Sequence, residues 1–303
     1  MKAARVVRRT AFFLIIAGLT YLYYPPFRYL VLFAAGRGTQ CTLRQALQSA
    51  DALRQQVADK DRILNASKLA GHDLGFEQWD TPRGRYWIPA GSRYMLPFDL
   101  AAQERKIYGA GDYGPHSGDI VLDCGAGVGV AVHDELAAGA KTVVAIEPAP
   151  ENLECLRRNY SGEIASGRVV VVPKGVWNQD DFLTLRVDPN NSSADTFVLP
   201  NQRAVEIERI PLTTIDELVS ELKLARVDYI KLDVAGAETK ALEGARQTLT
   251  KYRPRLSVAT YGQFEQPALI PTLIRAAHPD YQMDCGPCSE VSHTLHPDIL
   301  YFK

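Results

Sequence analysis

The chain has no excess of charge of either sign, because 34 lysines and arginines stand against 35 aspartates and glutamates in its 303 residues. This balance excludes a nucleic-acid binder that depends on bulk positive charge. Cysteine is also scarce, and its odd count of five argues against a disulfide framework. The length and the 46% of hydrophobic residues suit one large domain with a sizeable core and an appendage.

Acidic residues are missing from the first fifty positions, whereas seven basic residues occur there. An apolar stretch, residues 11–35, lies among these basic residues. In total it is long enough for a membrane span, which needs about 20 apolar residues. Pro25, Pro26 and Arg28 interrupt it, so the first apolar piece alone is short for a span.

Three interpretations of residues 11–35 compete. The segment is a signal anchor that spans once, an interfacial segment or hairpin folded at the two prolines, or a cleaved secretory signal. The third is disfavoured because no clear small-x-small cleavage site follows the apolar core. We therefore expect membrane attachment through this segment, with the first two interpretations left open.

The chain divides into three expected parts: a basic N-terminus with the membrane segment at 1–40, a helical stalk and loop-rich lead-in at 41–98, and a main domain at 99–303. Apolar residues at near-helical spacing from 42 to 70 predict a stalk or surface helix, or alternatively a short dimerising coil. Residues 71–98 are rich in Gly, Pro, Trp and Tyr without a period, which indicates loops.

The main domain alternates apolar strand patterns with helical ones. Strands are predicted at 120–124, 142–146, 168–172, 229–233, 256–260, 281–285 and 299–302, and helices at 130–138, 150–159, 214–222, 238–251 and 267–277. This alternation predicts an α/β fold with a doubly wound, mostly parallel sheet. Residues 182–211 suggest a hairpin insertion, and the last two strands, with no helix between them, suggest a hairpin at one edge.

The stretch "DIVLDCGAGVGVAV" places Gly125, Gly127 and Gly129 at every second position after a predicted strand. Such glycines let the backbone approach a ligand and turn tightly into a helix. The spacing differs from the G-x-G-x-x-G of dinucleotide-binding loops, which disfavours an NAD-dependent oxidoreductase. Asp123, two residues before the first glycine, suits the ammonium of S-adenosylmethionine better than a pyrophosphate. Glu147 ends the second strand, where doubly wound folds carry the acid that binds ribose.

The stretch "VDYIKLDVAGAETKALEGA" carries the second group of candidate residues. Lys231 and Asp233 share one side of a predicted strand, because side chains alternate with a period of two. Glu238 begins the helix that follows. We expect these side chains to face the same crevice as Asp123 and Glu147, at the carboxyl ends of the strands.

From about Asp99 to Lys303 the sequence resembles the FkbM family of methyltransferases, a branch of the S-adenosylmethionine-dependent class I enzymes. The resemblance rests on "GDIVLDCGAGVG", "VVAIEPAPENLECLRRN", "PLTTIDEL" and "DYIKLDVAGAETKALEGA". It implies the seven-stranded, Rossmann-like class I fold, S-adenosylmethionine as cofactor, and methyl transfer to an oxygen of a small-molecule, sugar or lipid-linked acceptor.

The resemblance also implies roles for single residues. Asp123 and the three glycines match the cofactor loop, and Glu147 matches the ribose-binding acid. Trp177 and Asn178 match the segment that contacts adenine. Asp233 matches the acid near the transferred methyl group.

As catalytic candidates we take Asp233, as general base or as orienting group, and Lys231 and Glu238 as supporting groups. For Lys231 and Glu238 the alternative is a structural ion pair or a helix-start charge. Tyr261 and Glu265 are reserve candidates.

Two positions depart from the family pattern: Ala235 replaces an acid, and Gly262 replaces a histidine. They indicate either a changed acceptor or a catalytically inactive, membrane-tethered nucleotide-binding module.

The tetrapeptide Cys285-Gly-Pro-Cys288 copies a thioredoxin-type motif and is followed by His293 and His296. A redox role requires the motif at the start of a helix, whereas a turn and a strand are predicted here. The four residues could bind zinc, but Gly-Pro between cysteines also simply forms a turn. We expect the turn and assign no metal.

Because S-adenosylmethionine is made in the cytoplasm, we expect a membrane-attached protein whose catalytic domain is cytoplasmic. A single span with a cytoplasmic basic N-terminus would place that domain outside. A segment bent at the two prolines removes this conflict.

Overall fold

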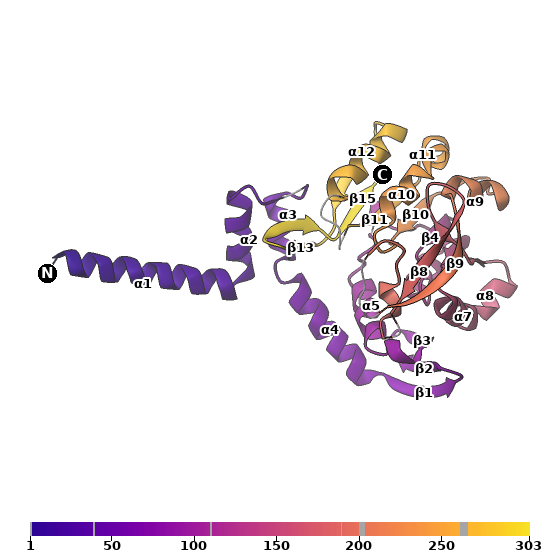
Figure 1. The fold of residues 1–303 in the computed structure, drawn as a ribbon, viewed down its shortest axis with the longest axis horizontal. Coiled ribbons are helices and arrows are strands. Elements are labelled where there is room, and N and C mark those ends of the chain that lie inside the picture. The colour runs from indigo at the N-terminus through magenta and orange to yellow at the C-terminus, as the bar shows by residue number, and fades with distance from the viewer. Residues whose placement is uncertain (1, 39, 110, 189, 200–203, 261–265) are drawn as a thin grey trace.

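The computed structural model describes all residues except 1, 39, 110, 189, 200–203 and 261–265. Its largest sheet has seven strands in the order β12-β15-β11-β10-β4-β5-β6 (Figure 1). The strands are β4 (Ile120–Cys124), β5 (Thr142–Ile146), β6 (Val169–Val172), β10 (Tyr229–Leu232), β11 (Arg255–Ala259), β12 (Met283–Cys285) and β15 (Ile299–Phe302). All seven predicted strands are confirmed, with ends that differ from the prediction by at most two residues.

The sheet is doubly wound and mostly parallel, as predicted. Starting from β4, the chain builds β5 and β6 on one side and later returns to build β10 and β11 on the other, all in parallel. β15 runs antiparallel to both β11 and β12. β12 and β15 pair at the edge, as the predicted hairpin requires, but they are not a simple hairpin, because residues 288–297 form a separate two-stranded sheet between them. The strand order reverses between β4 and β10, and ligands of such sheets lie outside the carboxyl ends at that point.

Helices cover both faces of the sheet because neighbouring residues of each strand point to opposite sides. Leu122 and Ile230 belong to a core cluster on one face, and Val121 and Tyr229 belong to a cluster on the other. The first cluster includes residues of α9 (Ile215–Glu221), α10 (Glu238–Glu243), α11 (Arg246–Tyr252) and α12 (Gln266–Ala277), and the second packs against α6 (Val130–Ala137), α7 (Pro150–Asn159) and α8 (Ser161–Ala165).

The helix predicted at 238–251 is divided into α10 and α11 at Gly244. A Cβ atom at Gly244 would lie 2.2 Å from the carbonyl oxygen of Trp177, so the chain passes too close there for any other residue. The predicted hairpin insertion is confirmed as β8 (Asp181–Val187) and β9 (Val205–Thr213), which pair antiparallel beside the short strand β7 (Gly175–Val176).

The prediction of loops at 71–98 is wrong. β1 (Lys68–Asp73), β2 (Phe76–Thr81) and β3 (Gly84–Pro89) form an antiparallel sheet that continues directly into a short 3-10 turn and α5 (Met95–Glu104). Tyr86 and Ile88 are buried in one cluster with Leu100 of α5, and Trp79 and Trp87 pack against it. These contacts hold the strands together. Burial does not alternate along β1 or β2, so their sequences show no period of two.

The predicted helix at 42–70 is present in two pieces, α3 (Leu43–Ser49) and α4 (Ala52–Ala66). Thr42 and Gln45 form a capping box that starts α3. α4 lies on the domain as a surface helix, since Ile63 is fully buried against β3 and α5. Residues 41–66 therefore contact the main domain along their length.

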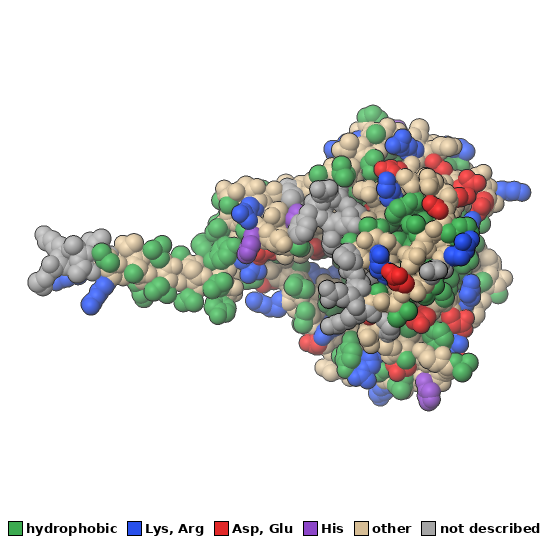
Figure 2. Space-filling view, in the orientation of Figure 1, with side chains coloured by type: hydrophobic (Ala, Val, Ile, Leu, Met, Phe, Trp, Pro, Cys, Tyr) green, Lys and Arg blue, Asp and Glu red, His purple; other side chains and the backbone are tan. Residues whose placement is uncertain are grey.

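The N-terminal segment consists of α1 (Lys2–Tyr23) and α2 (Pro25–Ala34), bent by 104° at the predicted proline break. Among the described residues no single helix is long and apolar enough to cross a membrane, and only this bent pair passes by length and composition. α1 extends away from the domain, with many hydrophobic side chains on its surface (Figure 2). α2 packs Tyr29 and Leu32 against Leu295, in the hairpin of β13 (Cys288–Val291) and β14 (Thr294–Pro297).

Candidate active site

The glycine loop joins the carboxyl end of β4 to α6. Gly125, Gly127 and Gly129 have φ angles of +83°, +56° and +95°, a region that other residues rarely adopt. A Cβ atom at Gly125 would lie 1.9 Å from the carbonyl oxygen of Asp233, and one at Gly129 would lie 2.2 Å from the ring of Tyr160. A Cβ atom at Gly127 would meet nothing within 4 Å, so the middle of the loop faces open space.

A buried ion pair lies beneath this loop. The register of β4 and β10 sets Lys231 opposite Asp123, and the Lys231 Nζ donates to Asp123 Oδ1 at 2.8 Å and to the Gly125 carbonyl at 2.9 Å. The two side chains are 3% and 0% exposed. Burial alone would lower the pKa of Lys231, but the charges of Asp123 and Asp233 raise it, so the ammonium stays protonated. The pair ties two strands to the glycine loop.

Glu147 lies directly after β5 and holds the loop from its other side. Its Oε2 accepts a hydrogen bond from the backbone N–H of Gly127 at 2.8 Å, and its Oε1 accepts one from Ala149 at 2.9 Å. Burial raises the pKa of Glu147, although these hydrogen bonds counteract the increase. The Asn152 side chain also donates to Oε1, at 3.3 Å. Oε2 keeps capacity for a further donor, so Glu147 can bind a ligand hydroxyl while it fixes the loop.

Asp233 follows β10 and meets two groups from α5 and the loop after it. The hydroxyl of Tyr108 donates to Asp233 Oδ2, and the Tyr108 ring centroid lies 4.8 Å from the Lys231 ammonium.

Asp99 of α5 accepts a hydrogen bond from the Ser193 hydroxyl at 2.9 Å. Burial raises the pKa of Asp99 to about 7, and the negative charge of Asp233 adds to this effect.

Glu238 stabilises the loop between β10 and α10. Its carboxylate accepts hydrogen bonds from the backbone N–H groups of Val234 and Gly236, at 3.0 and 3.1 Å. Burial, followed by the charge of Asp233, raises its pKa to about 7. Ala235, in the same loop, has a φ of +48°, which is unusual for a residue other than glycine.

A cavity of about 640 Å³ lies above the carboxyl ends of β4, β5 and β10. Of the predicted site residues, those that line it are Gly125, Gly127, Glu147, Lys231 and Asp233. Those that do not are Asp123, Gly129, Trp177, Asn178 and Glu238.

The predicted residues that do not line the cavity have other partners. Asn178 donates to Glu243 at 2.9 Å, and the backbone N–H of Trp177 donates to Thr213. The neighbouring residues 174–176 line the cavity in their place. Asp123 is fully buried, and its Oδ2 has no hydrogen-bond partner among the described residues.

The sequence did not reveal Asp99 and Tyr108 as site residues. Both lie at or near α5, before the first strand of the main sheet, and both line the cavity. The sequence signal for Asp99 was an acid within a mostly apolar helix. Such a signal does not show which part of the sheet the acid faces. Tyr261, Gly262 and Glu265 lie outside the described residues.

The Cys-Gly-Pro-Cys segment is the predicted turn, between β12 and β13, and no helix follows it. Hydrogen bonds with the thiols of Cys285 and Cys288, together with burial, raise the pKa of Cys41. His293 is exposed beside Glu290. Among the described residues, no group of three or more His, Cys, Asp or Glu side chains could hold a metal ion.

A family model described as a methyltransferase FkbM domain matches residues 123–295. Among solved structures, the chain is similar to methyltransferase FkbM from Methylobacillus flagellatus KT, with 18% identity and a TM-score of 0.47 over 84% of this chain and 60% of that chain. It is also similar to Trm5b from Pyrococcus abyssi (15% identity, TM-score 0.43, 77% of this chain and 57% of that one). M. jannaschii TYW2 in complex with AdoMet is a third similar structure (12% identity, TM-score 0.40, 78% and 86%).

The chain therefore spans less than two thirds of the length of the FkbM structure and of Trm5b. A search of curated proteins finds no match.

The two cavity-lining glycines of the loop predict different substitution effects. Gly127→Ala should lower the free energy of unfolding by about 1–2 kcal/mol, because an alanine at this positive φ angle adds backbone strain but no steric overlap. Gly125→Ala should lower it by about 3 kcal/mol or more, because its Cβ atom would also overlap the Asp233 carbonyl. Urea unfolding of both variants measures the difference, and equal losses would contradict the described loop geometry.

Proposed function

Because the chain belongs to the FkbM methyltransferase family, as the match over residues 123–295 shows, we propose that it transfers a methyl group from S-adenosylmethionine to an oxygen of an acceptor held in the cavity. The observation that carries this proposal is the arrangement of Glu147 and Gly127. Glu147, directly after β5, accepts a hydrogen bond from the backbone N–H of Gly127, in the middle of the glycine loop. The surface of this loop faces the cavity, which lies where the strand order of the sheet reverses.

The residues present fit this cofactor. Gly127 leaves open space over the loop, and the Glu147 carboxylate can accept a hydrogen bond from a ribose hydroxyl. The positive end of the α6 dipole and the Lys231 ammonium favour binding of the cofactor's carboxylate nearby. When bound, S-adenosylmethionine supplies a methyl group activated by the positive charge of its sulfonium.

The chain's own residues then position and deprotonate the acceptor. Asp99 takes the hydroxyl proton, because a carboxyl with a pKa of about 7 is both available as a base and basic enough near neutral pH. Asp233, fixed by Tyr108, accepts a hydrogen bond from the acceptor and orients its oxygen. With the acceptor oxygen held by Asp233 and Asp99, the bound cofactor would supply its methyl group to that oxygen, and alignment of the reacting groups would supply much of the rate.

We give the other predicted residues supporting roles. Asp123 holds Lys231 beneath the glycine loop, and Glu238 holds the loop that carries Asp233. An inactive binding module remains the second candidate function, favoured by Ala235 in place of an acid at the cavity wall. It predicts cofactor binding without methyl transfer.

We extend the proposal to location. Residues 11–35 attach the protein to a membrane as an interfacial segment bent at Pro25 and Pro26, and the catalytic domain lies in the cytoplasm. The 104° bend and the exposed apolar surface of α1 support this arrangement.

The first test concerns Glu147. Glu147→Ala should weaken binding of S-adenosylhomocysteine about tenfold or more, since a hydrogen bond to a charged group contributes about 1.5–3 kcal/mol. Isothermal titration calorimetry measures this. Glu147→Gln keeps one acceptor oxygen but sets its NH2 against the backbone N–H of Gly127 or Ala149, so it should give a smaller loss than the alanine variant. Unchanged affinity of the alanine variant would remove Glu147 from the site.

The second test concerns the base. Transfer of a radiolabelled methyl group into an extract of the source cells should increase with pH through an inflection near 7. Asp99→Asn should lose the inflection and about 10²–10⁴-fold of the rate. Ser193→Ala should move the inflection to higher pH, because the Ser193 hydrogen bond lowers the pKa of Asp99. An unchanged profile in Asp99→Asn would exclude Asp99 as the base.

The third test concerns location. Protease added to sealed inside-out vesicles, whose cytoplasmic face is outward, should digest the catalytic domain, and protease added to right-side-out vesicles should not. The reverse pattern would contradict the cytoplasmic placement.

A further inference from the structure

The cavity extends well beyond the glycine loop, to the N-terminal helices. Its lining includes Gly127 and Glu147 and also Arg28 and Tyr29 of α2 and Gln56 of α4. These last three residues lie outside the stretch that matches the family model. The helices that precede the main domain therefore form one wall of the cavity in which transfer takes place.

Contacts on several sides hold α2 in this wall. Arg28 Nε lies 2.6 Å from Glu290 Oε2, and both residues line the cavity. The hydroxyl of Tyr29 donates to the carbonyl of Cys288 at 3.5 Å. Leu32 is buried against Leu295. α2 is thus a fixed part of the wall, and its inner face contacts whatever occupies this end of the cavity.

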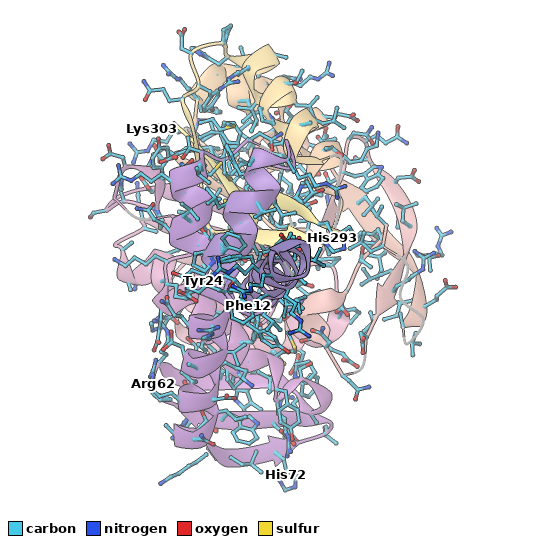
Figure 3. All side chains as sticks on the ribbon, turned by 90° about the vertical axis from the view of Figure 1, so that its left-hand side faces the viewer. Phe12, Tyr24, Arg62, His72, His293 and Lys303 are labelled. Atoms are coloured by element: carbon cyan, nitrogen blue, oxygen red, sulfur yellow. The ribbon has the colours of Figure 1, made fainter. Side chains whose placement is uncertain are left out.

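The outer side of the same helices is apolar. Leu30 and Val31 of α2 are exposed, as are Phe12 and most other large apolar residues of α1. Figure 2 shows hydrophobic side chains along α1 and around its corner with α2, and Figure 3, viewed from the free end of α1, shows Phe12 and Tyr24 in front of the domain. Seven basic residues and no acid occur in the first fifty positions, which complements the negative charge of anionic lipid head groups.

The cavity has the lining expected for an amphiphile. Apolar side chains of Tyr29, Leu96 and Phe98 lie among polar groups that include Asp99 and Asp233. Leu53 of α4 lines the cavity and is 64% exposed, so the cavity opens beside α4.

We propose that the acceptor is a membrane amphiphile whose hydroxyl-bearing head group enters between α2 and α4 and reaches Asp99, while its hydrocarbon chain stays with the bilayer bound by α1 and α2. This inference rests on the proposed methyl transfer and on membrane attachment, and it selects the lipid-linked class of acceptor. A soluble sugar or small molecule would have no need of a cavity wall built from membrane-facing helices.

Three phenylalanines offer matched positions for a photo-crosslinking test. Each is replaced by benzoylphenylalanine in the full-length protein: Phe98 in the cavity, Phe12 on α1 (60% exposed) and Phe182 on β8 (54% exposed). The variants are irradiated with vesicles of phosphatidylcholine, phosphatidylglycerol and glucosyl diacylglycerol. Intact mass spectrometry counts the lipid adducts, and methyl glucoside, the same head group without chains, is the soluble probe.

We expect lipid adducts at Phe12 and Phe98, each at least an order of magnitude more abundant than at Phe182. The methyl glucoside adduct at Phe98 should be at least an order of magnitude less abundant than the lipid adduct at equal concentration. An adduct at Phe12 without one at Phe98 would overturn the lipid-linked acceptor, and so would adducts at neither position or a methyl glucoside adduct as abundant as the lipid adduct. Binding of S-adenosylhomocysteine, measured by calorimetry on the same preparations, reports separately on the proposed methyl transfer. If that binding persists while the lipid adduct is missing, only the acceptor class fails.

Discussion

The buried pair of Lys231 and Asp123 is the interaction on which the site depends. Two charges with almost no exposure require each other, since removal of either would leave an uncompensated charge in the core, a change that typically costs 3–5 kcal/mol. The pair crosses from β10 to β4, and the same ammonium binds the carbonyl of Gly125. It therefore fixes the glycine loop relative to Asp233, which follows β10 two residues after Lys231.

The segments that precede the matched family stretch supply part of the cavity wall. Residues 123–295 supply the glycine loop, the acids that follow β5 and β10, and the main sheet except β15 and the first residues of β4. Asp99 and Tyr108 come from α5 and the loop after it, and residues of α2 and α4 also line the cavity. The cavity wall is thus completed by segments that precede the matched stretch.

The sequence predicted the main sheet well because its strands are continuous apolar runs, bounded by glycines or followed by strongly periodic helices. It failed at β1, β2 and β3, whose stability comes from aromatic contacts with α4, α5 and α7 that no local pattern shows. Glu147 was predictable because its place after the second strand is fixed by topology. The sequence does not show the ion pair of Lys231 with Asp123, because it depends on the register of two strands far apart in the chain. It does not show that Asp99 and Tyr108 lie at the cavity either, because that depends on how α5 packs.

The central claim is that this cavity binds a sulfonium nucleoside, with its ribose on Glu147 and its sulfur facing Asp233 and Asp99. A crystal structure of the full-length protein with S-adenosylhomocysteine tests it most directly. The account predicts ribose hydroxyls within hydrogen-bond distance of the Glu147 carboxylate and the sulfur on the Asp233 side of the glycine loop. A nucleoside bound outside this cavity, or crystals that take up NAD over the loop and no S-adenosylhomocysteine, would contradict it.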